Sequence, residues 1–369
     1  MKTFRRQNLV TGLAIVLMTA FVAFAQTATP TPKVTDDEII KVDSRLIVVP
    51  VSVTDTNGQP VFGLTAQDFR LTEESRLQAI DHVSSADKVP LEIALLFDVS
   101  ASTDKMFQFE LETAAKFLKD VMRTEDRATV FTIGAKPILV RPRDTSESIA
   151  TAIRDITPTK EFTAFYDTVA AAADYLKLNA PDGSRKVILV ISDGEDTNSA
   201  RISKAIQDGY RKINVNKIDN KSLYELTIKN RNEAGVAERR RILKLLQDVD
   251  TVFYSINPAG SSLQLNKMSL AGQENMHKFA EDTGGTAFLP KFQPLNTKDE
   301  LQNQSNGRKN ADVLDRIFRQ LANELRSQYL VQYYSDADFP VNKFVNLDVK
   351  LPNRSDLRIR ARQGYFVKN

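Results

Sequence analysis

Short apolar runs alternate with amphipathic stretches through the middle of the chain, from about residue 89 to residue 327. The runs are rich in aliphatic side chains and end in small polar residues, which is typical of buried strands in a parallel sheet. The strands predicted in this way are 91–97, 128–133, 186–191, 251–256 and 286–289. Because strands and helices alternate, we predict an α/β fold with a doubly wound, mostly parallel sheet.

The stretches between these strands are predicted to be helices, because their apolar residues recur at helical spacing. We expect these stripes to pack in the core and not to contact a cofactor. They contain Leu111, Ala114, Ala115, Leu118 and Val121, then Ile149, Ile153 and Ile156, and lastly Leu314, Ile317, Phe318, Leu321 and Leu325.

Both flanks of this region show strand patterns. Residues 46–53 read as a strand, and Asn57-Gly58 is a strong hairpin signal. Further strands are predicted at 69–72 and 80–83 on the first side, and at 329–334, 344–351 and 357–366 on the second. We therefore predict one small β-sandwich built from residues 41–88 and 328–369, with an α/β domain at 89–327 inserted into it.

A polar segment at about 200–238 does not fit the alternating pattern. Connections of this length are usually functional or disordered. We expect a solvated insertion with a short helical turn or hairpin near 222–229. Because it follows the strand end at Asp193, our hypothesis is that it lies over the ligand-binding face.

The N-terminus predicts export. Lys2, Arg5 and Arg6 precede an apolar stretch, and Ala-Phe-Ala at 23–25 resembles a cleavage site, so residues 1–25 are predicted to be a signal peptide. The alternative is an uncleaved anchor, but polar residues and glycine interrupt the stretch. Residues 26–40 are a Thr/Pro-rich linker. We expect a periplasmic or secreted protein with no stable membrane span after cleavage.

The amino-acid composition argues against several classes of function. The chain has no cysteine and only two histidines, His82 and His277, which argues against thiol catalysis, Cys-ligated zinc and His-based catalytic sites. Its formal net charge of +3 gives no reason to expect nucleic acid as a partner. Common catalytic and phosphate-binding motifs are absent from the sequence. We therefore do not predict an enzyme.

Oxygen-bearing side chains follow two of the predicted strands. Asp98, Ser100 and Ser102 come directly after strand 91–97, and Asp193 comes after strand 186–191. Thr163 stands just before the intervening helix. Such residues also serve as ordinary helix caps. Gathered at the carboxyl edge of a parallel sheet, however, they offer hard oxygen donors suited to Mg²⁺, Mn²⁺ or Ca²⁺.

The order DVSAS, TAFYD and ISDGED resembles the von Willebrand factor A domain and its metal-ion-dependent adhesion site. The flanking segments TDTNGQPVFGLTAQDF, ELRSQYLVQYY and RARQGYF resemble the exported bacterial "VWFA-related" proteins frequent in acidobacteria. The resemblance implies that Ser100, Ser102 and Thr163 bind a divalent cation directly or through water. It also implies that Asp98 and Asp193 supply charge, and that the sixth position takes a Glu or Asp of a protein partner.

Other residues lie next to these motifs. The family often has glycine just before the loop threonine, where this chain has Glu161-Phe162, and this departure affects how closely Thr163 approaches an ion. We expect Asp167, Glu195 and Asp196 to lie around the ligands or to face the partner. Asp167 is expected to support the helix start, and Asp196 to cap a turn.

Three functions remain open from the sequence. The favoured one is an exported module that captures an acidic side chain of a protein through a divalent cation. The second is a metal-assisted hydrolase that activates water on the same ion. The third is a structural protein with a vestigial site, and the complete five-residue set argues against it.

Overall fold

The computed structural model describes residues 45–100, 104–159, 161–213, 218–258, 267–295 and 297–368, all within one compact unit. The predicted signal peptide and linker and the candidate ligand Ser102 lie outside these residues. No helix in the described ranges is both long and apolar enough to cross a membrane.

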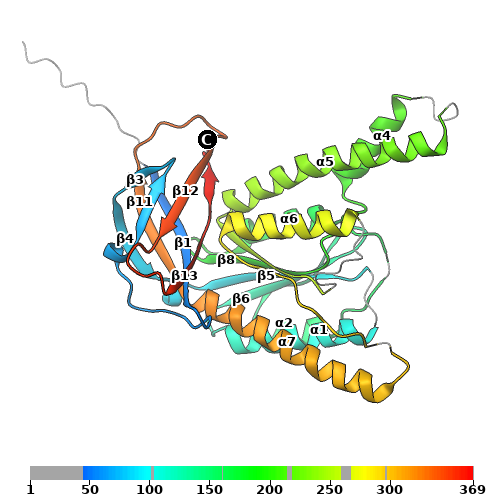
Figure 1. The fold of residues 1–369 in the computed structure, drawn as a ribbon, viewed down its shortest axis with the longest axis horizontal. Coiled ribbons are helices and arrows are strands. Elements are labelled where there is room, and N and C mark those ends of the chain that lie inside the picture. The colour runs from blue at the N-terminus through cyan, green and yellow to red at the C-terminus, as the bar shows by residue number, and fades with distance from the viewer. Residues whose placement is uncertain are drawn as a thin grey trace, which may run out of the picture. The chain divides into compact units, whose positions relative to one another are not determined.

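A six-stranded sheet forms the centre of the α/β region, in the order β10-β9-β8-β5-β6-β7 (Figure 1). All neighbouring strands are parallel except β7, which pairs antiparallel with β6. The strands are β5 (Leu91–Asp98), β6 (Arg127–Ile133), β7 (Pro137–Asp144), β8 (Arg185–Ile191), β9 (Thr251–Ile256) and β10 (Ala287–Phe288). This confirms the predicted fold class. The edge strand β7 was not predicted, because most of its side chains are exposed and its apolar run, residues 138–140, is short and flanked by Pro137 and Pro142.

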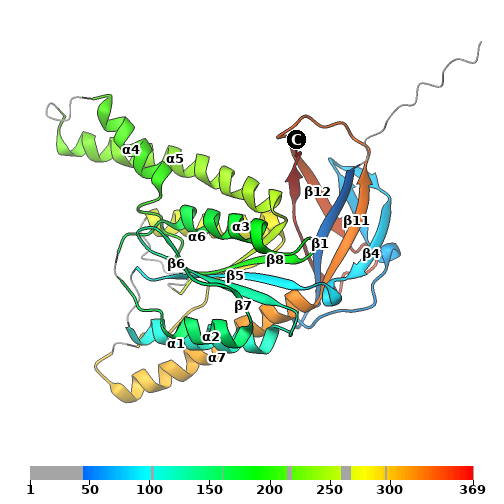
Figure 2. The ribbon, with the colours of Figure 1, turned by 180° about the vertical axis from the view of Figure 1, so that it is seen from behind.

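Helices cover both faces of this sheet, as Figures 1 and 2 show from opposite sides. Side chains of β5 alternate between two cores: Leu95 packs with residues of the first face, and Leu96 packs with residues of the second. The first face carries α1 (Asp104–Val121), α2 (Ser146–Arg154) and α7 (Glu300–Arg326), and the second carries α3 (Phe165–Asn179), α5 (Asn220–Asp248) and α6 (Lys267–Thr283).

The expectation for residues 200–238 was wrong in one respect, since most of the segment is helical. Helix α4 (Ala200–Arg211) packs along the first part of α5. The hydroxyls of Tyr210 and Thr227 are 2.6 Å apart between the two helices, and Ile202 is buried in the core under the second face. The sequence carries a signal for α4, since Ile202, Ile206, Tyr210 and Ile213 recur at helical spacing, and sequence analysis missed it.

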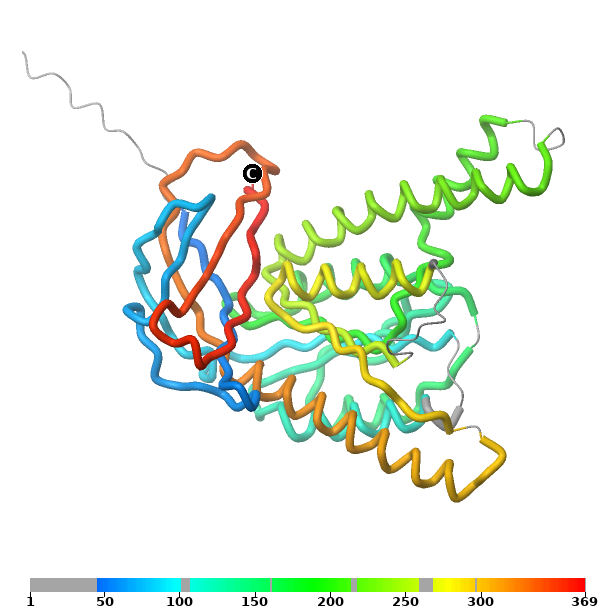
Figure 3. Tube along the Cα trace, viewed as in Figure 1, coloured from blue at the N-terminus to red at the C-terminus, as the bar shows by residue number. Residues whose placement is uncertain are grey.

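Two four-stranded antiparallel sheets complete the fold, in the orders β13-β1-β11-β4 and β14-β12-β2-β3. Each sheet takes strands from both ends of the chain, as the tube in Figure 3 allows the reader to follow. Two 3₁₀ turns, Ala66–Asp68 and Ala86–Lys88, lie among the early strands. The strands are β1 (Arg45–Asp55), β2 (Arg70–Glu73), β3 (Arg76–Gln78), β4 (Ile80–Ser85), β11 (Gln328–Ser335), β12 (Phe344–Lys350), β13 (Leu357–Ala361) and β14 (Gly364–Phe366).

The predicted strand 357–366 is in fact two strands that belong to different sheets. The chain leaves the first sheet after Ala361 and enters the second at Gly364. An added Cβ on Gly364 would stand 2.3 Å from the carbonyl oxygen of Val345, so the turn into β14 requires a residue without a side chain. The crossing links the two sheets covalently.

A buried carboxylate also links the two sheets. Glu73 on β2 accepts hydrogen bonds from the hydroxyls of Tyr333 (2.7 Å) and Ser335 (2.9 Å) on β11 and of Tyr365 (2.8 Å) on β14. Its side chain is only 2 % exposed. Three donors compensate the desolvation of this charge.

Replacement of Glu73 by Ala is expected to lower the free energy of unfolding by about 3 kcal/mol, because it leaves three buried hydroxyls without an acceptor. Urea unfolding of the purified protein measures this difference. Arg76→Ala, at an exposed position of β3, is the control and should have a negligible effect. A Glu73→Ala variant as stable as the control would show that this carboxylate does not hold the sheets together.

Candidate functional site

The two predicted acidic loops lie beside each other at the carboxyl edge of the central sheet. Phe97 of β5 pairs with Ile191 of β8, so Asp98 and Ser192 follow in register on adjacent parallel strands. The chain continues from β5 to β6 on one side of β5 and later places β8 on the other side. In open α/β sheets, ligands bind where the connections diverge in this way.

Hydrogen bonds connect the first loop to the third. The backbone N–H of Ser100 donates to Oδ1 of Asp98 at 3.0 Å, and the Ser192 hydroxyl donates to Oδ2 at 2.6 Å. The same hydroxyl accepts from the backbone N–H of Gly194 at 2.9 Å. Ser192 therefore fixes the orientation of the Asp98 carboxylate, a role that sequence analysis missed although the residue lies next to Asp193.

The second loop is connected to the third through the backbone of Thr163, whose side chain is 5 % exposed. Its N–H donates to the Thr197 hydroxyl at 2.8 Å, and its carbonyl accepts from the N–H groups of Thr197 (2.8 Å) and Asn198 (2.9 Å). Thr163 is thus held in position without using its own hydroxyl in these bonds, which leaves that oxygen as a candidate ligand.

Asp167 and Asp196 hold the starts of two helices. The carboxylate of Asp196 accepts from the backbone N–H groups of Tyr166 and Ser199, each at 3.0 Å. Asp167 accepts from the N–H of Ala200 at 2.8 Å, at the start of α4. Both carboxylates therefore stabilise the loops by accepting hydrogen bonds from backbone N–H groups. Their negative charge is also favourable at helix N-termini.

The third loop packs closely on α6. Gly194 has φ +77°, and a Cβ on it would stand 2.7 Å from the carbonyl oxygen of Gly272. The Ser269 hydroxyl of α6 donates to the carboxylate of Glu195. Since Gly272 has equally little room for a side chain, the two glycines allow the loop and the helix to approach at backbone distance.

The site carries negative charge on partly buried carboxylates. Burial raises the pKa of Asp98, although hydrogen bonds from Ser100 and Ser192 oppose this shift. Burial, together with the nearby carboxylates of Asp98 and Glu195, raises the pKa of Asp193 to about 6. Within the described residues no Lys or Arg is among the causes that shift the pKa of Asp98 or Asp193, and a bound cation would provide a compensating positive charge.

A further buried carboxylate, Glu110 on α1, was not singled out by sequence analysis. It is 3 % exposed, and its Oε1 has no hydrogen-bond partner among the described residues. Burial, together with the negative charge of Asp98, raises its pKa to about 8. The sequence signal was an acidic residue beside Leu111, on the stripe otherwise formed by core residues.

These features fit a hard divalent cation held partly by water. Over the described ranges, no three His, Cys, Asp or Glu side chains gather as a metal site. The predicted set instead combines the carboxylates of Asp98 and Asp193 with the hydroxyls of Ser100, Thr163 and Ser102. Carboxylate and hydroxyl oxygens, together with uncompensated negative charge, are the chemistry that Mg²⁺, Mn²⁺ or Ca²⁺ requires.

Comparison with known families supports the same region. Residues 93–195 match the profile of the von Willebrand factor type A domain. This span contains most of β5, all of β8 and all five predicted ligands, from Asp98 to Asp193. A search of curated proteins returned no match.

The solved structures to which this chain is similar share little sequence identity with it. An aerotolerance-related membrane protein from Bacteroides fragilis is 14% identical, with a TM-score of 0.34, over 61% of this chain and 99% of its own. Proximal thread matrix protein 1 from the mussel byssus, with a zinc-occupied MIDAS motif, is 13% identical, with a TM-score of 0.39, over 69% and 50%. The PilB minor pilin of Streptococcus sanguinis is 11% identical, with a TM-score of 0.39, over 63% and 62%.

Glu110→Gln is expected to change the pH dependence of stability in the absence of metal. The folded-state pKa of about 8 lies above the usual 4.5, so the folded chain keeps a proton that the unfolded chain releases between these values. Stability therefore falls as the pH rises through this window. The neutral amide removes that loss, worth about 4 kcal/mol between these pH values.

Urea unfolding at pH 4.5 and pH 8 in EDTA measures this effect. The variant should gain stability relative to the unmodified protein as the pH rises between the two values. Parallel pH profiles for the two proteins would contradict the assignment of a buried, unpaired Glu110.

Proposed function

We propose that this chain is an exported binding module that captures an acidic side chain of a protein partner through a divalent cation. The observation that carries the proposal is the placement of Asp98 and Asp193 on adjacent strand ends, coupled through the Ser192 hydroxyl and short of positive charge. The residues that would hold the cation are Asp98, Ser100, Ser102, Thr163 and Asp193.

The bound cation would supply an electrophilic centre that accepts a carboxylate oxygen. Asp98 and Asp193 balance its charge, and the hydrogen bonds from Ser100 and Ser192 keep the Asp98 carboxylate oriented. The hydroxyl donors add oxygen atoms without adding charge. A site with only two carboxylates therefore leaves the ion attractive to an incoming anion.

The surface next to these loops suits a protein partner. Phe162, directly before Thr163, is 69% exposed, and exposed aromatic side chains are frequent anchors in interfaces. A groove of about 1120 Å³ begins at Gly194 and continues between α5 and α6. The exposed Tyr224 and Val236 line it. These features support a contact wider than one coordinated carboxylate.

Export and the finer family placement also belong to the proposal. The predicted signal peptide at 1–25 supports a periplasmic or secreted location, and the flanking motifs support a place among the exported bacterial VWFA-related proteins. The hydrolase remains the alternative use of the same ion. Turnover of a peptide or phosphoester substrate that stops with EDTA would favour it over the binder.

Mg²⁺ or Mn²⁺ is expected to stabilise the protein by about 2.7 kcal/mol at one hundred times its Kd, because the folded state alone binds it. Asp98→Ala and Asp193→Ala should each abolish this stabilisation, since each removes half of the carboxylate charge. Thermal unfolding with and without the cation measures it. Asp182→Ala, at an exposed position, is the control and should respond as the unmodified protein does. A Mg²⁺ response that persists in both site variants would refute the metal site.

Phe162→Ser is expected to weaken partner capture about tenfold while leaving the cation affinity unchanged. Immobilised protein is exposed to a cell-envelope extract in Mg²⁺, and the proteins that EDTA releases are quantified. The control is Leu178→Ser, which removes a similarly exposed apolar side chain near the end of α3. Equal capture by both variants would exclude Phe162 from the interface, and capture unaffected by Asp193→Ala would contradict the cation-dependent mechanism.

A further inference from the structure

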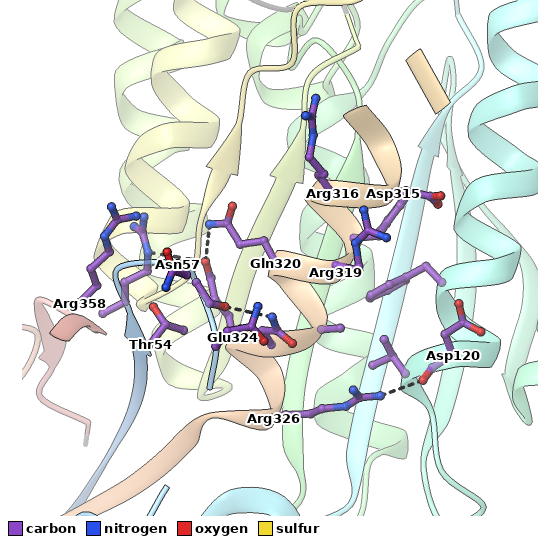
Figure 4. Close-up of a pocket in the computed structure, with 18 of the residues that line it drawn as sticks. Thr54, Asn57, Asp120, Asp315, Arg316, Arg319, Gln320, Glu324, Arg326 and Arg358 are labelled. Carbon is purple, nitrogen blue, oxygen red and sulfur yellow. Dashed lines mark hydrogen bonds and ion pairs between the residues drawn. The ribbon is translucent and has the colours of Figure 1, made fainter. Parts of the chain in front are cut away.

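A cleft of about 640 Å³ lies where the sandwich meets the first face of the α/β sheet (Figure 4). Its walls come from the hairpin after β1, the second half of α1, the second half of α7 and strand β13. Nothing in the proposed metal site contributes to it. The volume is in the range of clefts that bind ligands or short peptide segments.

The cleft is strongly basic. Its basic side chains are Lys116, Arg316, Arg319, Arg326, Arg358 and Arg360, and its acidic side chains are Asp120, Asp315 and Glu324. Two of these acids are already engaged. Asp315 pairs with Lys116 at 3.4 Å, and the buried Glu324 accepts hydrogen bonds from Thr286 (2.7 Å) and Gln320 (2.9 Å).

Three exposed guanidinium groups remain without a carboxylate partner. Arg316 and Arg319 stand on α7 and Arg358 on β13, and none of them forms an ion pair within the described part of the chain (Figure 4). Guanidinium groups bind carboxylates through two parallel hydrogen bonds. Because these arginines lie on two separate elements, an anion in the cleft can be contacted by guanidinium groups of both. An isolated surface arginine does not provide this.

The floor of the cleft is rigid and partly apolar. The rings of Phe117 on α1 and Phe318 on α7 stack with centroids 4.7 Å apart, and both are nearly buried. The Asn323 side chain donates to the carbonyl of Gly58 at 3.0 Å, which ties the hairpin to α7. Arg326 donates to the carbonyl of Asp120 at 3.0 Å, which ties α7 to α1. The walls are thus held together before any ligand arrives.

We propose that this cleft binds an acidic polypeptide segment, rich in Asp and Glu, of a protein partner. The excess of basic side chains and the unpaired guanidinium groups attract carboxylates. The amides of Asn57, Gln59 and Gln320 in the same lining suit the N–H and C=O groups of a peptide backbone.

The same lining disfavours a phosphate polymer. A polypeptide brings N–H donors that can pair with Asp120, whereas phosphate groups offer only acceptors. The formal net charge of the whole chain is only +3, so a broad basic face of the kind that nucleic acids require is not expected.

The cleft is independent of the cation. Helix α1 starts after the carboxyl end of β5, and Asp126, beyond its far end, accepts from the N–H of Leu91 at the amino end of that strand. The second half of α1 therefore lies at the opposite edge of the sheet from Asp98. Binding at the cleft should not need a metal.

The test measures fluorescence anisotropy of a labelled octaglutamate peptide with the full chain, in EDTA and at low salt. EDTA prevents carboxylates from binding at the proposed metal site. A negative result therefore contradicts the proposal for the cleft and leaves the proposal for the metal site unaffected. We expect saturable binding that weakens with added salt. Arg316→Glu/Arg319→Glu should raise the Kd at least tenfold, and Arg358→Glu, on a different element, should raise it as well.

The matched control is Arg308→Glu/Lys309→Glu, which makes the same change in charge on exposed residues of the same helix outside the cleft. It should change the Kd less than twofold. Arg316→Lys/Arg319→Lys should raise the Kd less than charge reversal does. This difference would show that misfolding is not the cause of the lost affinity. The proposal is overturned if the unmodified protein does not bind the peptide or if the control loses as much affinity. Tighter binding of oligo-dT or of phosphatidylglycerol vesicles would also overturn it.

Discussion

Parallel pairing of β5 with β8 is the constraint on which the rest of the structure depends. Strand β5 is buried on both faces and lies between β6 and β8 at the centre of the sheet. Its register with β8 brings Asp98 next to Ser192, and one hydrogen bond between them couples the first and third loops. Hydrogen bonds of Thr163 and Thr197 then place the second loop against the third. The order of the strands in the sheet therefore brings together three separate loops, and the candidate site forms only where they meet.

Much of this could be predicted from the sequence, because a strand covered on both faces needs a continuous apolar run. Residues 251–256, for example, form β9 with the predicted bounds. The helices within residues 200–238 were missed, although Ile202, Ile206, Tyr210 and Ile213 recur at helical spacing, because the many polar residues between them favoured a solvated connection. The crossing between sheets near Arg362 was missed because both sides read as strand, although Gly364 was a local signal of it.

Within the site, sequence reasoning identified the candidate ligands but only some of the residues that position them. Ser192 gains its role from a neighbouring strand 94 positions away, which no local motif reveals. Glu110 lies on the apolar stripe of α1, but the pattern does not reveal that its carboxylate is buried without a partner for Oε1 among the described residues. Asp167 and Asp196 were expected to support a helix start and a turn, but the sequence does not show which backbone N–H groups of other loops they accept from. Contacts of this kind depend on three-dimensional packing and not on residue spacing.

The sandwich has a consequence for the order in which the chain folds. Strand β1 pairs with β11, for instance Val49 with Val331, so almost the whole domain between them forms one long loop that must close. Both sheets need strands from each end, so the first cannot be completed before β13 has been synthesised and the second not before β14. The entropy of closing such a loop is much smaller once the intervening residues have already folded into a compact body. The folded α/β region therefore brings the two chain ends close together, and the sandwich is the last part of the fold to be completed.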